Sequence, residues 1–151
     1  MKINGRNESR ILIADDDASI RQLLTTIVKR ERLTVDSAVD GEAAIRKLRQ
    51  HEYSVILLDL MMPNVDGFGV IDYLREHPPA NKPVVLVITA YADQKFKRVD
   101  PDVVAGVVRK PFEVAELGSL VRLCAIGLDD HLAGRVDRSV ADSSEASDSV
   151  N

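Results

Sequence analysis

The sequence lacks tryptophan, has only 4% aromatic residues and contains a single cysteine, Cys124. With one cysteine, neither an intrachain disulfide nor a cysteine-based zinc site is possible, and the core must consist mainly of valine, leucine, isoleucine and alanine. No stretch approaches the roughly 20 apolar residues of a membrane-spanning helix, and the first residues include no apolar signal-peptide region. We therefore expect a cytoplasmic protein without membrane insertion.

An extended basic surface, which binding to nucleic acid would require, is also lacking. The net charge is −4, and residues 127–151, with six acids and two arginines, account for all of it. The apolar pattern fades in these residues, so we expect a disordered acidic tail. Residues 1–9 are polar, and we expect them to be flexible. We predict no direct contact with nucleic acid.

Between these ends, short apolar runs alternate with helical patterns. The predicted strands are residues 10–14, 34–38, 55–58, 83–88 and 106–109. The predicted helices are residues 19–32, a segment after Gly41, a segment after Gly67 that stops at His77, residues 93–99 and residues 113–126. Such alternation favours right-handed crossovers and a parallel sheet covered on both sides. The expected fold is a doubly wound α/β domain over residues 10–126.

Four of the five predicted strands stop at polar residues suited to chemistry. The run 55–58, typical of a strand buried on both faces, ends in a carboxylate. Neighbouring strands lie about 4.8 Å apart, so we expect the polar side chains to converge at the carboxyl edge of the sheet, where α/β domains bind ligands. The residues at these strand ends are Asp15, Asp16, Asp59, Thr89 and Lys110.

Three carboxylates in one crevice repel one another unless a cation lies among them. Mg²⁺ is the expected cofactor, because it binds few carboxylates and keeps waters that leave room for a phosphoryl group. An ionised carboxylate there can attack phosphorus and form an acyl phosphate. The reaction also needs charge neutralisation on the phosphoryl oxygens, which the metal, the Lys110 ammonium and the Thr89 hydroxyl would share.

Four segments, taken in order along the chain, resemble a known family. They are Ile-Leu-Ile-Ala-Asp15-Asp16, Leu-Leu-Asp59-Leu-Met-Met-Pro63-Asn-Val-Asp66-Gly67, Ile-Thr89-Ala90 and Arg-Lys110-Pro111-Phe112. The chain resembles the receiver domain of bacterial two-component response regulators over residues 10 to about 126. This resemblance implies a CheY-like, flavodoxin-like α/β fold with a five-stranded parallel sheet in the order 2-1-3-4-5.

The resemblance also implies roles for individual residues. Asp59 would be the phosphoacceptor. Asp16 would hold Mg²⁺ together with Asp59 and the Met61 backbone carbonyl, and Asp15 would support the ion through water. The phosphodonor would be a histidine kinase or a histidine phosphotransfer protein, and the output would be binding to a protein target. We expect a monomer or weak dimer that is not an enzyme, with at most slow self-dephosphorylation.

A second set of implied roles concerns the response to phosphorylation. Thr89 and Lys110 would contact the phosphoryl group and couple it to a conformational shift, and the Lys110–Pro111 peptide bond would be cis. Three residues before the lysine, the family usually has a Tyr or Phe whose ring moves inward on activation, but here the residue is Val107. Either Val107 simply fills a strand position, or the switch lies in the loop after Thr89, where Tyr91 would move instead.

Three other interpretations stay open. An aspartyl-phosphate phosphohydrolase typically needs a second acid two residues after its nucleophile, where this chain has Met61. A cofactor-binding flavodoxin-like domain needs a phosphate loop after the first strand, where this chain has three acids at residues 15–17. The chain is also interpretable as the receiver fragment of a longer regulator with a missing output domain, although we expect a regulator of the single-domain type.

Overall fold

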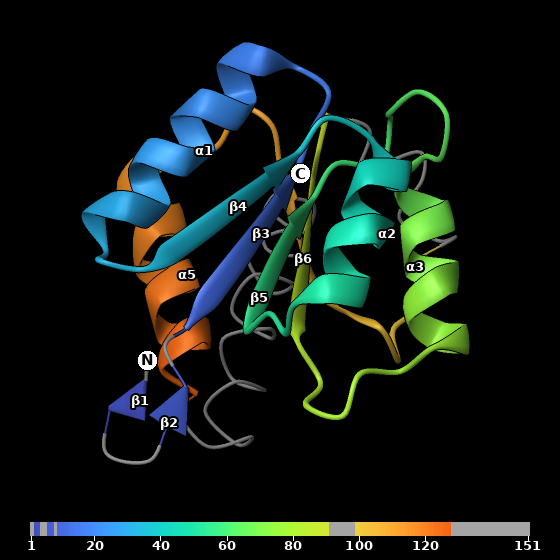
Figure 1. Cartoon of the computed structure of the whole chain (residues 1–151). Helices are drawn as coiled ribbons and strands as arrows, with labels where there is room; N and C mark the ends of the chain where they lie inside the picture. The colour runs from blue at the N-terminus through green and yellow to red at the C-terminus, as the bar shows by residue number, and fades with distance from the viewer. Residues whose placement is uncertain (1, 4–5, 8, 91–98, 128–151) are drawn as a thin grey trace.

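A five-stranded, all-parallel sheet forms the centre of the protein, and helices cover both of its faces (Figure 1). The structure is a computed structural model that describes residues 2–3, 6–7, 9–90 and 99–127. The strands of the sheet are β3 (Arg10–Ala14), β4 (Thr34–Ala38), β5 (Val55–Leu58), β6 (Val84–Thr89) and β7 (Val104–Arg109). The described helices are α1 (Ala18–Arg30), α2 (Gly41–Gln50), α3 (Gly67–Glu76) and α5 (Val114–Ile126).

The strand order is β4-β3-β5-β6-β7, which is 2-1-3-4-5 when these five strands are counted along the chain. The expected doubly wound α/β fold and its strand order are therefore confirmed. Helices α1 and α5 lie on one face of the sheet, and α2 and α3 lie on the other (Figure 1). No helix in the described part of the chain combines the length and apolar character that crossing a membrane requires.

The sheet separates two apolar layers. Successive residues of a strand point to opposite faces, so Val55 and Leu57 of β5 pack with α1 and α5, whereas Ile56 and Leu58 pack with α2 and α3. All four residues are at most 1% exposed. Each such aliphatic side chain contributes about 1.5–3 kcal/mol by leaving water. The buried run expected from the sequence is therefore the central strand of the sheet.

Three helices begin with an aspartate at the edge where the strands end. The N-caps are Asp17 for α1, Asp40 for α2 and Asp66 for α3. In each case the carboxylate accepts hydrogen bonds from backbone N–H groups of the first turn. Such a cap contributes about 1 kcal/mol to stability. These caps also add carboxylates to the edge that carries the predicted site.

The elements differ from the expected ranges mainly at their ends. The first helix ends at Arg30 rather than Arg32, because the chain turns there and Arg32 has a φ of 60°. The fifth strand begins two residues earlier than expected, at Val104, and its pairing with β6 shifts register between Val104 and Gly106. Of the predicted helix at 93–99, only Val99 belongs to the described residues, and of the predicted acidic tail only Gly127 does.

The expected flexible segment 1–9 contains a short paired element. Strands β1 (Lys2–Ile3) and β2 (Arg6–Asn7) pair antiparallel (Figure 1). Ser9 then joins this segment to the domain, since its hydroxyl donates to the Ala125 carbonyl at 2.9 Å. The flexibility of residues 1–9 and the boundaries of the domain stay predictions.

Candidate functional site

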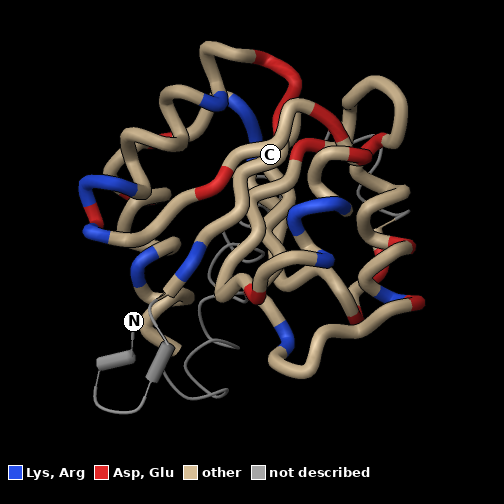
Figure 2. Tube along the Cα trace, in the orientation of Figure 1, with Lys and Arg blue, Asp and Glu red and all other residues tan. Residues whose placement is uncertain are grey.

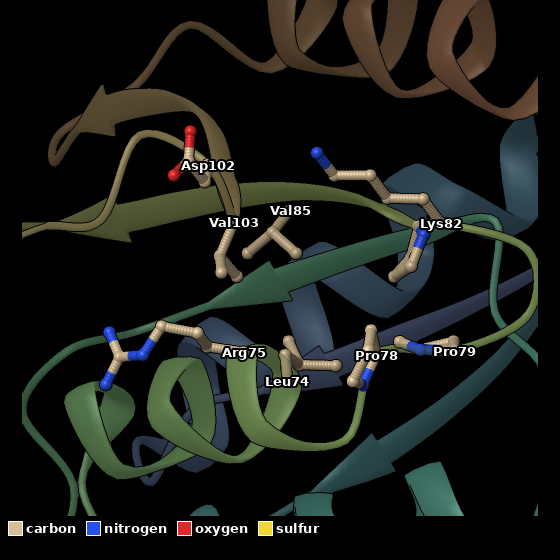
Figure 3. Close-up of a pocket in the computed structure, with 9 residues that line it drawn as sticks. Leu74, Arg75, Pro78, Pro79, Lys82, Val85, Asp102 and Val103 are labelled. Atoms are coloured by element: carbon tan, nitrogen blue, oxygen red, sulfur yellow. The ribbon is translucent and has the colours of Figure 1, made fainter.

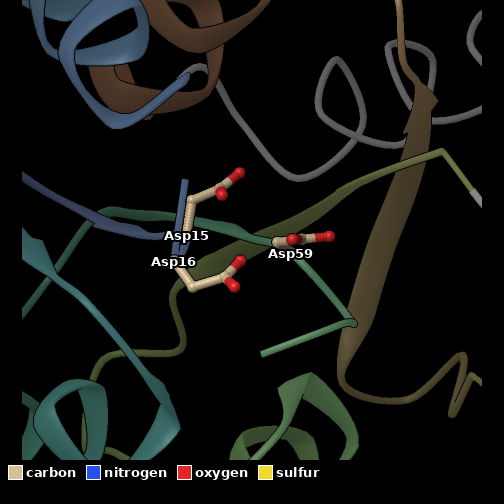
Figure 4. A group of neighbouring side chains, drawn as sticks. All are labelled: Asp15, Asp16 and Asp59. Carbon is tan, nitrogen blue, oxygen red and sulfur yellow. The ribbon is translucent and has the colours of Figure 1, made fainter. Parts of the chain in front are cut away.

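Three aspartates meet where β3 and β5 end. Ala14 of β3 is in register with Leu58 of β5, so the residues that follow them, Asp15 and Asp59, lie next to each other. The Asp59 N–H donates to the Ala14 carbonyl at 2.9 Å and extends the pairing to this point. Carboxylate oxygens of Asp15, Asp16 and Asp59 all lie within 4.8 Å of one another (Figure 4).

Asp15 is the most tightly held of the three. It is 1% exposed, and its Oδ1 accepts a hydrogen bond from the Asp17 N–H at 2.9 Å. Its Oδ2 accepts from the Lys110 ammonium, also at 2.9 Å. The Arg21 guanidinium on α1 donates to the Asp15 carbonyl at 2.8 Å. The Asp15 carboxylate is thus committed to fixing Lys110 and the loop before α1.

Asp59 is buried but has few partners. It is 7% exposed, the Lys110 ammonium lies 3.7 Å away, and the Met61 N–H donates at a long 3.5 Å. Burial raises the pKa of the Asp59 carboxyl to about 6, Lys110 opposes this rise, and the charges of Asp15 and Asp16 add to it. Among the three acids, Asp59 therefore combines proximity to a cation with an oxygen that no short hydrogen bond restrains.

The cluster suits a divalent metal ion. Asp16 is exposed and gives access from solvent, whereas Asp15 and Asp59 are buried. With all three acids ionised, Lys110 neutralises only one charge, which leaves two negative charges for a cation to balance. The ligand atoms that the three acids offer to a metal ion are all carboxylate oxygens, and Mg²⁺ prefers oxygen ligands. Further acids lie along the same edge of the sheet (Figure 2).

Thr89 and Lys110 come from the adjoining ends of β6 and β7. Thr89 is the last residue of β6 and is fully buried. The Lys110 N–H donates to the Thr89 carbonyl at 3.0 Å, and the Lys110–Pro111 peptide bond is cis. The structure thus brings Lys110 to Asp15 and Asp59, with Thr89 on the strand next to β5.

The candidate switch residues have different positions. Val107 of β7 is in register with Val87 of β6 and is 9% exposed, in the apolar layer with α2 and α3. Tyr91 lies outside the described residues. Met61, whose carbonyl the resemblance assigns to the metal, is a half-exposed loop residue with its N–H directed at Asp59.

The sequence pattern missed two features of this site. The hydrogen bond from Arg21 to the Asp15 carbonyl has no local signal beyond the position of Arg21 one turn into α1. The contact of Asp40 with Asn64, which joins two loops beside the site, was also unforeseen. The sequence hints at this contact only through the Asp40-Gly41 pair at the start of α2 and through Asn64 in the loop after β5.

A separate hollow of about 360 Å³ lies at the opposite edge of the sheet (Figure 3). It is bounded by the end of α3 and the segments that lead into β6 and β7. Arg75, Lys82 and Asp102 stand among mainly apolar lining residues, and Arg75 is already paired with Asp72 and Asp100. The hollow shares no residue with the candidate site.

The protein is thus a doubly wound α/β domain with a cluster of acids, suited to binding a metal ion, at the carboxyl edge of its parallel sheet. The family model for the response regulator receiver domain matches residues 11–122. The chain therefore belongs to the response regulator receiver family, and the resemblance inferred from its motifs is confirmed.

Curated relatives extend this result. The chain is 33% identical over 127 residues to the transcriptional regulatory protein GltR of Pseudomonas aeruginosa, covering 83% of this chain and 50% of the relative. It is 34% identical over 116 residues to the probable transcriptional regulator ycf27 of Porphyridium aerugineum, covering 76% and 47%. This chain spans about half the length of these relatives.

Solved structures give the same fold. The chemotaxis protein CheY4 of Vibrio cholerae matches with a TM-score of 0.70 and 25% identity, covering 78% of this chain and 99% of that chain. The response regulator TrrA of Thermotoga maritima, solved in complex with Mg²⁺-BeF, matches with a TM-score of 0.68 and 28% identity, covering 77% and 98%.

Proposed function

We propose that this protein is a phosphorylatable signalling module in which Asp59 accepts a phosphoryl group from a histidine kinase or a histidine phosphotransfer protein. The observation that carries the proposal is the cluster of Asp15, Asp16 and Asp59 beside Lys110, in a chain of the receiver family. Asp59 is the proposed nucleophile because it is the buried acid without a short hydrogen bond to a side chain.

The proposed transfer is an in-line displacement at phosphorus. A carboxylate oxygen of Asp59 forms the new O–P bond while the N–P bond of a phosphohistidine breaks, and the electron pair of that bond returns to the imidazole. With its pKa at about 6, most of Asp59 is ionised at pH 7 and can act as the nucleophile. Lys110, 3.7 Å from Asp59, would balance charge on one phosphoryl oxygen. The Thr89 hydroxyl would donate a hydrogen bond to another phosphoryl oxygen.

Mg²⁺ would be held by Asp16 and Asp59, with the Met61 carbonyl as a further ligand and Asp15 acting through water. When bound, the ion neutralises charge on the phosphoryl group and on the acids. Because Asp15 binds Lys110 at 2.9 Å, Asp15 would also hold the lysine ready to contact the incoming phosphoryl group.

The output of the module would be the binding of a partner protein in the cytoplasm. Phosphorylation shifts an equilibrium only if one conformation holds the phosphate better. Val107 and Tyr91 are the proposed candidates for the switch. A second candidate function is the receiver part of a longer transcriptional regulator, favoured because the named relatives are about twice as long.

The test is incubation with Mg²⁺ and acetyl phosphate followed by intact mass measurement. The wild type is expected to gain one phosphoryl group, whereas Asp59→Asn gains none. Asp72→Asn, at an exposed acid of α3 away from the site, is the matched control and should gain the group normally. An undiminished adduct on Asp59→Asn would overturn the assignment, and rapid turnover of phosphomonoesters would favour a phosphohydrolase.

A further inference from the structure

Two loops beside the acidic cluster are joined by a pair of hydrogen bonds. The Asn64 amide Nδ2 donates to Asp40 Oδ2 at 2.7 Å. The Gly41 N–H donates to the Val65 carbonyl at 2.8 Å. These four residues, here called the loop clamp, connect the turn between β4 and α2 to the loop that leaves Asp59.

The local geometry at the clamp tolerates few alternatives. A Cβ atom added at Gly41 would lie 2.1 Å from the Val65 carbonyl oxygen, a backbone atom that cannot move aside without moving its loop. Asn64 has a φ of 64°, in the left-handed region that Asn occupies more readily than most side chains. The contact between the loops therefore depends on the residue types at both positions.

Capping of α2 does not account for the second oxygen of Asp40. Its Oδ1 already accepts from the Ala43 N–H at 2.8 Å and completes the N-cap. Oδ2 is directed to the other loop, and both hydrogen bonds lower the pKa of the Asp40 carboxyl, the one from Ala43 most strongly. Asp40 thus stays ionised and able to accept from Asn64 at any neutral pH.

The loop held by the clamp returns to the backbone of Asp59. The Gly67 N–H donates to the Leu60 carbonyl at 3.0 Å, and a Cβ at Gly67 would lie 2.4 Å from the Asp59 carbonyl oxygen. The segment 59–67 is therefore a closed loop with one tie near Asp59 and the other at the clamp. Because both ties act on one short loop, a shift at Asn64 or Val65 would change the path of the backbone at Leu60 and Met61.

We propose that Asp40, Gly41 and Asn64 are positioning residues of the phosphoryl-transfer site, which act by fixing the backbone from Asp59 to Met61. The inference rests on the proposed function. Asp40 and Asn64 contact neither the metal nor the phosphoryl group in this assignment. Their effect is on the place of the Asp59 carboxylate and of the Met61 backbone, where small displacements weaken metal binding and slow transfer.

The test uses two variants that break the clamp and keep the local fold. Asn64→Gly accepts the positive φ but removes the amide, and Asp40→Ser keeps an N-cap oxygen for α2 but does not reach Asn64. We expect each variant to bind Mg²⁺ about tenfold more weakly, as is typical for residues that orient metal ligands, and to take phosphate from acetyl phosphate more slowly at saturating Mg²⁺. Calorimetry gives the first quantity and intact mass over time gives the second.

Two further variants separate positioning from a general loss of stability. Tyr53→Phe removes a 2.7 Å hydrogen bond to Asp36, away from the acidic cluster. It should lower stability while leaving Mg²⁺ affinity and phosphorylation unchanged. Asp40→Asn should keep the Mg²⁺ affinity and the phosphorylation rate of the wild type. The Asn64 amide can rotate so that its oxygen accepts a hydrogen bond from the new amide N–H group at position 40.

The outcomes distinguish this inference from the proposed function. Mg²⁺ affinity and phosphorylation within about twofold of wild type in both clamp variants, well short of an orienting residue's usual effect, would overturn the inference while Asp59 still takes phosphate. Failure of the wild type to form an adduct would overturn the proposed function, and the Mg²⁺ affinities would still decide whether the clamp positions the metal ligands. A wild type that binds no Mg²⁺ would overturn both.

Discussion

At Asp59 the fold places a carboxyl group where ionisation is unfavourable and yet required. Burial raises its pKa, and Lys110 only partly offsets this effect because its closest partner is Asp15, at 2.9 Å rather than 3.7 Å. The site therefore retains unbalanced negative charge without a metal ion. A residue optimised for stability alone would be neutral at this position.

This conflict predicts a pH-dependent stability. The pKa of Asp59 is about 6 in the folded chain and about 3.9 when unfolded. As pH rises between these values, the unfolded chain releases its proton while the folded chain keeps it, so the folded state loses stability. At about 1.4 kcal/mol per pKa unit, the full loss is at most about 3 kcal/mol.

We expect Asp59→Asn, in metal-free buffer, to be more stable than wild type by about 1–3 kcal/mol at pH 8. The difference should shrink as pH falls and approach zero below about pH 3, where the wild-type carboxyl is protonated in both states. Urea unfolding at several pH values measures it. A difference that is independent of pH would show that the carboxyl charge is not its cause.

At the scale of helices and strands, local signals were sufficient wherever the deciding contacts are local. The aliphatic run at β5 and the acids before α1 and α3 depend on neighbours a few residues away, and the predicted elements formed there. The alternation of elements also predicted the parallel sheet, which in turn brought Asp15 and Asp59 together.

Contacts between distant segments were not predictable in the same way. Asp40 and Asn64 are 24 residues apart, and no hydrophobic periodicity in the sequence predicts that these two residues are in contact. Strand ends indicated that Lys110 would reach the acids, but not that Asp15 would be its closer partner. Such choices depend on loop geometry and side-chain reach, which hydrophobic patterns do not encode.

Glycines within the elements lead to a second prediction. Gly118 lies inside α5, where a Cβ would meet Ile27 at 3.4 Å and Glu31 at 3.6 Å, both ordinary contacts. Because alanine favours a helix interior over glycine, Gly118→Ala should stabilise the protein by about 0.5–1 kcal/mol. Thermal unfolding measures this gain. Gly67→Ala is the contrasting variant, since its Cβ overlaps the Asp59 backbone, and a gain in stability there would contradict this explanation.

For the whole molecule, metal binding and folding should be coupled. The acidic cluster is assembled from segments that only the folded sheet brings together. A ligand that binds the folded state alone stabilises it by mass action. The three acids repel one another in the folded state, and a bound cation relieves this repulsion. We therefore expect Mg²⁺ binding to raise the stability of the folded domain.

At a Mg²⁺ concentration tenfold above its dissociation constant, we expect stabilisation of about 1.4 kcal/mol, or a rise in Tm of about 5 °C. Differential scanning calorimetry with and without a chelator measures the shift, and NaCl at matched ionic strength is the control. Asp16→Asn should lose most of the effect. An equal shift in Asp16→Asn would mean that Mg²⁺ acts elsewhere.

The central sheet has a further consequence for how the protein unfolds. Strands β3, β5 and β6 each contribute alternate residues to the two apolar layers. Both layers therefore depend on the same three strands. Loss of α1 and α5 would expose one face of the strands that α2 and α3 need as a support. We therefore expect the two halves of the core to melt together in one cooperative transition, without a stable half-folded intermediate.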